Sequence, residues 1–272
     1  MGTFILQRFS SIAAVAALFL LASTQAFAGA FRAMPLRLYL DSKSKSEVLR
    51  ITNEGDEAVT VQIDTKTWAQ DGNGQDVYGD TTEIVVFPKM ATIEKGATQI
   101  VRIGFNGAPA GREQTYRLFV QELPVSKPGE MALKFALTMS LPVFVAPDQK
   151  VIDWSVEPGV LKQETLPVKV TNNGNHHVMI SKIKAIGLDA NGAELFTQEA
   201  TGWYTLAGQS RTFPVNVPYQ QCEVAARIRV EVQGAESSKT TELAVNRTMC
   251  SRKPPAASKT DKATPPKPRA QQ

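Results

Sequence analysis

Two arginines lie within stretches in which apolar and polar side chains alternate. Arg37 lies in the segment PLRLYLD, and Arg117 lies in the segment TYRLFVQELP. Because successive side chains of a strand point to opposite faces, each arginine shares a face with an aromatic residue, Tyr39 or Phe119. A guanidinium that is partly withdrawn from water needs an anion, and a carboxylate bound through two hydrogen bonds satisfies it. The two arginines are therefore candidates for binding a partner's carboxylate, or for ion pairs within this chain.

Other polar groups give weaker indications of chemistry. The segment DGNGQD, from Asp71 to Asp76, offers oxygen ligands at alternate positions, but it lacks the glycine and glutamate of a calcium loop and is interpreted as a hairpin loop. His176 and His177 are adjacent, and adjacent strand residues point apart, so they are interpreted as surface histidines rather than a metal pair. The chain has no motif of a nucleophile, a zinc-binding helix or a phosphate-binding loop. We therefore expect no enzyme activity, no metal and no cofactor.

The segment LKFALTMSLPVFVAP, residues 133–147, is apolar at seven successive alternate positions. On a strand these seven side chains lie on one face. Strands usually have five or six residues, and a long apolar edge promotes aggregation. Something must therefore cover this strand, either the chain's own core or another polypeptide.

Most other segments also alternate with a period of two and are rich in Val, Ile, Thr and Phe, which is typical of an all-β sandwich. No amphipathic helix is expected after residue 28. A faint internal repeat, Thr-Asn-x-Gly between two strands, places Gly55 and Gly174 in turns where positive φ is expected. Strands are expected near residues 36–41, 47–53, 58–68, 83–87, 98–104, 115–123 and 132–145, and again near 151–157, 166–172, 178–188, 194–199, 211–217, 226–233 and 240–246.

The order of segments predicts an exported protein with two domains. Residues 1–28 have the features of a signal peptide: Arg8, a short apolar run and a small-x-small cleavage pattern. The two sandwich domains are expected over residues 29–147 and 148–250. Residues 251–272 form a basic, Pro- and Lys-rich tail that is expected to be disordered.

The net charge limits the classes of partner that are expected, and the cysteine content bears on disulfide formation. The formal net charge is +4, but Arg8 and a net charge of +5 in residues 251–272 leave the folded part at about −2. The composition therefore does not favour nucleic acid as a partner. Cys222 and Cys250 are the two cysteines, and in an oxidising compartment we expect them to form a disulfide worth roughly 3–4 kcal/mol. A catalytic thiol is the alternative, but no Cys/His pattern accompanies it.

Several segments, taken in order, resemble the PapD-like periplasmic chaperones of the chaperone–usher pathway, which assemble pili and fimbriae. The resemblance covers residues 35–147 well and the second domain only loosely. The connection VSKPGEMA is similar to the family's short-loop subclass, and the segment YRLFVQELP is more similar to its archaic branch than to the classical one. The matching segments are LYLDSKSKSEVLRITN after Arg37, FPKMATIEKGATQIVRI, GREQTYRLFVQELP and LKFALTMSLPVFVAP.

The resemblance implies two immunoglobulin-like sandwiches set at an angle around a cleft. It also implies donor-strand complementation, in which the chaperone lends a strand to an incomplete pilus subunit. Residues 141–145 are then expected to belong to the chaperone's own core. The positions that match the family's donor residues are Leu133, Phe135, Leu137 and Met139.

The chain departs from the family pattern at two places. Arg37 matches one of the two basic residues that hold the subunit's terminal carboxylate, but the second position holds Pro142. Arg117 is the proposed replacement, with Arg102 as a reserve. The family's interdomain ion pair is also incomplete, because Glu113 fits the acidic partner while the arginine position holds Ala146.

The resulting expectation is a periplasmic chaperone that caps pilus or fimbrial subunits and delivers them to an outer-membrane usher. It would be able to self-associate through its donor edge. The alternative is a structural or adhesive exported protein with two immunoglobulin-like domains. Such a fimbrial subunit should lack a strand and carry an extended N-terminal donor peptide, whereas this chain supplies fourteen expected strands.

Overall fold

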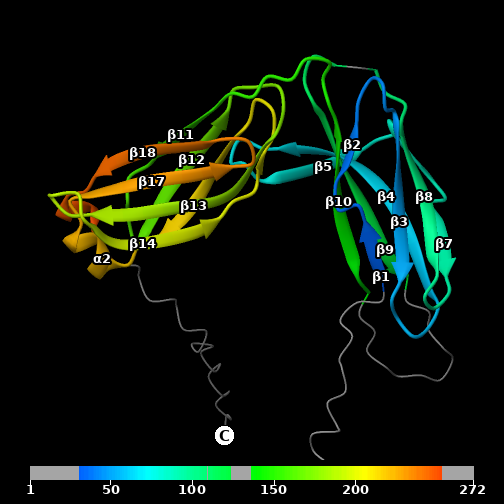
Figure 1. Cartoon of the computed structure of the whole chain (residues 1–272), viewed down its shortest axis with the longest axis horizontal. Helices are drawn as coiled ribbons and strands as arrows, with labels where there is room; N and C mark the ends of the chain where they lie inside the picture. Colours follow the sequence, from blue (N-terminus) through cyan, green and yellow to red (C-terminus); the bar gives the residue numbers. More distant parts are fainter. Residues whose placement is uncertain (1–30, 109, 124–135, 253–272) are drawn as a thin grey trace, which may run out of the picture.

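The structure, a computed structural model, describes residues 31–108, 110–123 and 136–252. Nearly all of this part is β-strand, arranged in two sandwiches that meet at an angle (Figure 1). The predicted all-β, immunoglobulin-like fold class is confirmed. No helix among the described residues is long and apolar enough to cross a bilayer. The expected signal peptide, residues 1–28, and residues 253–272 of the expected tail lie outside the described residues.

The first sandwich consists of two sheets built from residues 31–145. One sheet has the strand order β1-β3-β8-β6, and the other has the order β2-β10-β9-β4-β5, with β7 paired to the other end of β4. The pair β2–β10 is parallel, whereas β10 pairs with β9 in the antiparallel sense. The strands are β1 (Phe31–Met34), β2 (Leu38–Leu40), β3 (Ser46–Asn53), β4 (Val59–Gln70), β5 (Asp76–Asp80), β6 (Ile84–Phe87), β7 (Met90–Ile93), β8 (Thr98–Phe105), β9 (Gln114–Leu123) and β10 (Thr138–Val145).

Alternation along these strands builds a single core between the two sheets. Leu49 of β3 pairs with Val101 of β8, and both side chains are fully buried. Leu118 and Val120 of β9 face them from the opposite sheet and are buried to the same extent. Residues that are β-branched or aromatic suit this pleated, half-buried surface. Each such side chain contributes about 1.5–3 kcal/mol through the apolar area that it removes from water.

The second sandwich repeats this architecture with residues 154–244. Its sheets have the orders β11-β12-β16 and β14-β13-β17-β18, and β15 pairs with β13. One short α-helix and one 3-10 helix follow β16 and β18. The elements are β11 (Trp154–Pro158), β12 (Thr165–Asn172), β13 (Val178–Leu188), β14 (Glu194–Thr201), β15 (Tyr204–Thr205), β16 (Ser210–Asn216), α2 (Tyr219–Val224), β17 (Arg227–Gly234), β18 (Ser238–Ala244) and η1 (Arg247–Met249).

A disulfide closes the end of the second sandwich. Cys222 of α2 is bonded to Cys250, which follows η1, with the two Cα atoms 5.6 Å apart. The predicted pairing is therefore confirmed. Both sulfur atoms pack against the apolar core of this sandwich. The link ties the last segment of the described chain to the helix that precedes β17.

The repeated Thr-Asn-x-Gly motif forms the same turn in both sandwiches. The buried amides of Asn53 and Asn172 each donate two hydrogen bonds to backbone carbonyls, and their Oδ1 atoms accept the N–H groups of Gly55 and Gly174. The prediction of positive φ at these glycines is wrong, because the asparagine side chain closes the turn instead. Gly174 is nevertheless required, because a Cβ there would lie 2.3 Å from the carbonyl oxygen of Val151.

Other elements differ from the sequence-based expectation in detail. The strands β1, β5, β7 and β15 were not expected, and α2 contradicts the expectation of no helix. The DGNGQD segment is the predicted hairpin loop, in which Asp71 Oδ1 accepts the backbone N–H groups of Asn73 and Gln75. A strand is expected from residue 132, and among the described residues it begins at Thr138. Residues 136 and 137 have no strand structure, and residues 132–135 lie outside the described part.

The two sandwiches meet through an apolar cluster that contains residues of both. Trp68 of β4 and Phe144 of β10 pack against Tyr204 and Leu206 of the second sandwich. Gln70 completes the contact through its amide, which donates to the Tyr204 carbonyl and accepts the Leu206 N–H. The hairpin formed by β4 and β5 extends toward the second sandwich (Figure 1). The relative position of the sandwiches is therefore fixed by buried side chains as well as by the chain connection.

Candidate functional site

The strand β10 has one edge that is only partly paired. Its whole length pairs with β9, but on the other edge only Val143–Val145 pairs with β2. Among the described residues, no strand pairs with residues 138–142 along that second edge. Unpaired N–H and C=O groups of a strand edge are a template for pairing with another chain. This edge is therefore able to receive an added strand.

The apolar face of β10 changes from exposed to buried along the strand. Leu137 and Met139 are only partly buried and pack against the margin of the first core. Leu141, Val143 and Val145 lie within that core. The expected division of the segment at residue 141 therefore matches the burial. Leu133 and Phe135, the other two expected donor residues, lie outside the described residues.

Arg37 lies at the exposed start of β2, beside the parallel pairing with β10. Leu38 and Leu40 are buried, while Arg37 and Tyr39 are exposed on the opposite face, as the alternation predicted. Leu36, which has the same alternation as Leu38 and Leu40, is exposed because it precedes the strand. Tyr39 stacks on Phe144 with the ring centroids 5.6 Å apart. The guanidinium of Arg37 is thus accessible at the end of β10 that reaches the junction.

Arg117 is almost completely buried, with 3% of its surface exposed. Its guanidinium lies 3.8 Å from the ring centroid of Trp68 and 5.5 Å from that of Trp203. Nε and Nη2 have no hydrogen-bond partner among the described residues. Burial lowers the pKa of this guanidinium from its ordinary value, and the nearby charge of Asp76 partly opposes that shift. Arg117 is therefore a buried cation that aromatic faces stabilise in place of an ion pair.

Tyr204 connects the two arginines electrostatically. Burial raises the pKa of the Tyr204 hydroxyl, and Arg37 opposes this by charge and by hydrogen bonding, with a further contribution from the charge of Arg117. Both guanidinium groups thus act on one hydroxyl of the second sandwich. Among the described residues neither arginine forms an ion pair with Asp or Glu. Ion pairs within this chain, the alternative to binding a partner's carboxylate, are therefore not observed for either arginine among the described residues.

Arg102 is not part of this arrangement. It is exposed on β8, in the sheet opposite to the one that contains β2, β9 and β10. The structure thus separates the reserve candidate from Arg37. Sequence reasoning also missed Trp68, Trp203 and Tyr204, which surround Arg117. The aromatic pair that follows Gly202 is the one local feature that could have indicated them.

Glu113, just before β9, forms the polar contact of the junction. Its carboxylate Oε2 accepts the backbone N–H of His177 and lies 2.8 Å from Nδ1 of the same residue. Its Oε1 lies 3.1 Å from Nε2 of His176. Glu113 thus contacts two histidines instead of the arginine that family resemblance would place here. The interpretation of His176 and His177 as surface residues is wrong, because their side chains are 12% and 8% exposed.

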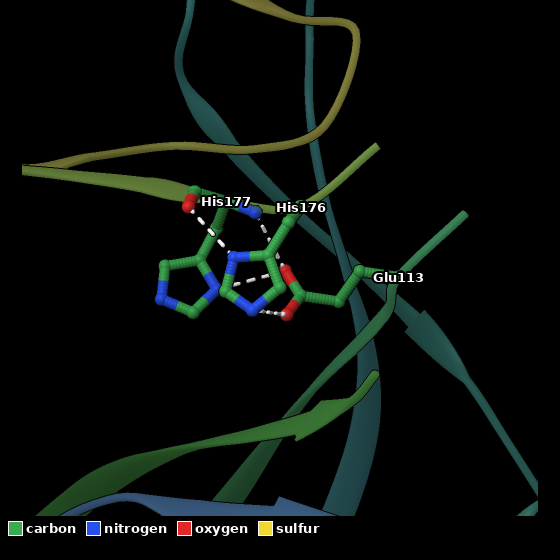
Figure 2. A group of neighbouring side chains, drawn as sticks. All are labelled: Glu113, His176 and His177. Carbon is green, nitrogen blue, oxygen red and sulfur yellow. Dashed lines mark hydrogen bonds and ion pairs between the residues drawn. The ribbon is translucent and has the colours of Figure 1, made fainter. Parts of the chain in front are cut away.

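The adjacent histidines converge because they do not lie on a strand. They follow the Asn172 turn and precede β13, so the rule that neighbouring side chains point apart does not apply to them. Their rings stack with centroids 4.4 Å apart, and the His177 ring also stacks on Phe144 at 3.9 Å. Figure 2 shows both rings beside the same carboxylate. Only tertiary structure brings these three residues together.

Comparisons with known proteins agree with this geometry. Residues 30–150 match the family described as pili and flagellar-assembly chaperone, PapD N-terminal domain. A comparison with curated protein sequences finds no match. Several solved structures of pilus chaperones have the same fold as this chain.

One similar structure is the CsuC–CsuE complex of chaperone and tip adhesion subunit from the archaic chaperone–usher Csu pili of Acinetobacter baumannii. It has 22% identity and a TM-score of 0.54, with 79% of this chain and 98% of that chain covered. The YadV chaperone has 17% identity and a TM-score of 0.55, with 80% and 100% covered. The chaperone–tip adhesin complex of CFA/I fimbriae has 16% identity and a TM-score of 0.51, with 80% and 100% covered. At these identities the likeness concerns the fold.

The sequence match and the fold lead to one conclusion. The match covers the whole sandwich that contains β10 and the two arginines. The likeness to solved structures extends over both sandwiches. The N-terminal sandwich, residues 30–150, matches the PapD N-terminal domain family of pili and flagellar-assembly chaperones, and the chain as a whole is similar in fold to solved structures of chaperone–usher pilus chaperones.

Proposed function

We propose that this protein is a periplasmic chaperone that binds pilus or fimbrial subunits by donor-strand complementation and delivers them to an outer-membrane usher. The observation that carries the proposal is the half-paired edge of β10, which has partly buried Leu137 and Met139 at one end and exposed Arg37 beside the other. The proposed role is binding and involves no catalysis.

The edge supports strand addition for two physical reasons. Residues 138–142 present backbone groups that pair on one side only, and a subunit strand would satisfy them. Leu137 and Met139 retain apolar surface that a subunit's open groove would remove from water. At about 25 cal/mol per Å² of apolar area, completing their burial contributes on the order of 1 kcal/mol each before the costs of association. Leu133 and Phe135 are proposed to extend the same face.

The two arginines support the binding of the subunit's terminal carboxylate. Arg37 is exposed and makes the direct contact. Arg117 is buried, with its guanidinium 5.5 Å from the ring centroid of Trp203, so its charge acts on the same region from a buried position. A fixed carboxylate would set the register of the added strand along β10.

A pull-down from periplasmic extract tests this proposal. The full chain is co-expressed with exported proteins encoded beside it, and subunit recovery is measured for Arg37→Ala and for Arg102→Ala. We expect Arg37→Ala to reduce recovery at least tenfold while the chaperone remains folded. Arg102→Ala removes the same exposed charge from the opposite sheet and should bind as the wild type does.

A second matched pair tests the apolar part of the site. Met139→Asn introduces a polar side chain at the proposed donor edge, and Ile100→Asn does the same at an exposed position of β8. We expect recovery to fall only for Met139→Asn. Equal recovery for all four variants and the wild type would contradict the proposed site, and failure of the wild type to retain any exported partner would contradict the proposed function.

A further inference from the structure

The junction carboxylate of Glu113 is buried without a cationic side chain that neutralises it. Its side chain is fully buried, and among the described residues no lysine or arginine contacts it. Oε2 accepts two hydrogen bonds, both from His177, whereas Oε1 has no hydrogen-bond partner. A buried carboxylate that lacks a counter-charge is costly. The atom closest to Oε1 among the ionisable groups is Nε2 of His176 (Figure 2).

The hydrogen bonds of His176 determine which of its nitrogens carries the proton. Nδ1 lies 3.0 Å from the backbone carbonyl oxygen of His177, and a carbonyl only accepts, so Nδ1 carries the proton. In the neutral ring Nε2 then has a lone pair, and this lone pair faces Oε1 of Glu113 at 3.1 Å. Two electron-rich atoms this close repel each other unless a cation lies between them.

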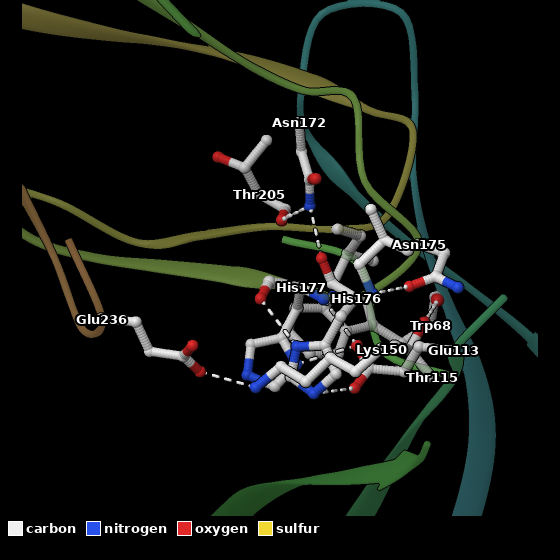
Figure 3. Close-up of polar contacts among 12 residues, drawn as sticks. Trp68, Glu113, Thr115, Lys150, Asn172, Asn175, His176, His177, Thr205 and Glu236 are labelled. Carbon is white, nitrogen blue, oxygen red and sulfur yellow. Dashed lines mark hydrogen bonds and ion pairs between the residues drawn. The ribbon is translucent and has the colours of Figure 1, made fainter. Parts of the chain in front are cut away.

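Lys150 does not supply that cation, because it is paired with Glu236 at 2.5 Å and points away from the carboxylate (Figure 3). Oε1 of Glu113 has no hydrogen-bond partner among the described residues, so this oxygen and Nε2 of His176 together present two ligand atoms to an ion.

The ligand atoms present match those of a transition-metal site. One nitrogen from each histidine and one oxygen of Glu113 all lie within 4.8 Å of one another. Metal-bound histidines commonly donate their other ring N–H to a backbone carbonyl, as His176 Nδ1 does to His177. Imidazole nitrogen with carboxylate oxygen is a ligand set that zinc prefers. Both histidines also line a pocket, together with Trp154, Met179 and Glu236.

We propose that Glu113, His176 and His177 form a binding site for a divalent transition-metal ion, zinc by ligand preference, at the junction of the two sandwiches. His176 binds through Nε2 and Glu113 through Oε1. His177 binds through Nδ1, which gives up its proton as the ion takes that place, while Nε2 takes up a proton from solvent, so that the ring stays neutral. Because Glu113 belongs to the first sandwich and both histidines to the second, the ion would join the two domains directly.

The site would also act on the strand that carries Arg117. Glu113 immediately precedes β9, and its backbone N–H donates to the carbonyl of Asn175 in the second sandwich. Asn175 in turn donates to the carbonyls of Gly111 and Gln149. A bound ion would therefore reinforce contacts that already hold the start of β9 against the second sandwich.

The composition of the chain makes the test specific. The sequence has two histidines, both in this site, and the two cysteines are joined in a disulfide. Full-length protein treated with a chelator is titrated with Zn²⁺ by calorimetry, and its melting temperature is followed with and without the ion. We expect one equivalent of zinc to bind and the melting temperature to rise on binding.

Three variants separate the proposed ligands from nearby acidic surface. His176→Gln and Glu113→Gln should each lose the stoichiometric binding and the rise in melting temperature. Glu236→Gln removes a neighbouring acidic side chain that is not a proposed ligand and should bind zinc as the wild type does. Subunit recovery is a separate measurement, so a failure of the metal site leaves the chaperone proposal standing.

A measurement on the wild type does not depend on any variant folding. X-ray absorption of the zinc-loaded protein should show scattering from two imidazole rings. Absence of stoichiometric binding, a spectrum without imidazole, or equal zinc binding by folded His176→Gln would each overturn the proposed site.

Discussion

Arg117 and Glu113 lie four residues apart in sequence, and both are buried charges at the junction, but they are stabilised in opposite ways. Arg117 has aromatic faces on two sides and two N–H groups without acceptors. Glu113 has one oxygen fixed by His177 and the other facing a nitrogen lone pair. The cation is held by packing and the anion by hydrogen bonds. We therefore expect the removal of the two charges to lower the free energy of unfolding by different amounts.

The largest effect is expected from removing the aromatic cover of Arg117. Trp68 is buried and also packs on Phe144 and Tyr204, so Trp68→Ala should lower the free energy of unfolding by about 3–5 kcal/mol. Denaturant unfolding measures this. Trp203 lies on the other side of Arg117 and is 36% exposed, so Trp203→Ala should lower the free energy of unfolding by clearly less than Trp68→Ala. Equal costs would show that the two rings contribute equally to the junction.

A direct comparison of the two charges should give an intermediate effect. Glu113→Leu leaves the His177 N–H and imidazole without an acceptor, so we expect it to lower the free energy of unfolding by about 2–3 kcal/mol. Arg117→Met removes a charge with unpaired donors and keeps apolar contact with Trp68, so its cost should stay below about 1 kcal/mol. Both are measured by denaturant unfolding in a chelator. A larger loss of unfolding free energy for Arg117→Met than for Glu113→Leu would contradict this expectation.

The smallest effect concerns alkaline pH. Burial raises the pKa of Tyr204 above its ordinary value of about 10, so the neutral hydroxyl is favoured in the folded chain. The stability that this residue contributes is present below about pH 10 and is lost as pH rises above that value. Since the charge of Arg117 opposes the shift, Arg117→Met should raise the Tyr204 pKa further. Tyrosinate absorbance compared with Tyr204→Phe measures it, and an unchanged or lower pKa would contradict the geometry.

The sequence predicted the parts of the site that depend on alternation along one strand. Arg37 projects from the face opposite to Leu38 and Leu40 because side-chain direction in a strand follows from position alone. The resemblance, and not the alternation, placed the start of the core portion at residue 141, and Leu137 and Met139 are less buried than Leu141. The disulfide was expected from two cysteines in a chain that is predicted to be exported.

The sequence did not predict the junction. The aromatic enclosure of Arg117 and the convergence of His176 and His177 on Glu113 join residues 49 or more positions apart. Local pattern assigned the histidines to opposite faces, and this failed because they lie in an irregular segment after a turn. Local rules of side-chain direction hold only inside regular elements.

Taken alone, the amino-acid order determined the fold class and the exposed position of Arg37, because both follow from the alternation of apolar and polar side chains along strands. Tertiary structure decided how deeply Arg117 is buried and what surrounds Glu113. Those properties depend on how two sandwiches pack against each other, and burial and charge balance at such a contact are set by residues that are distant in sequence.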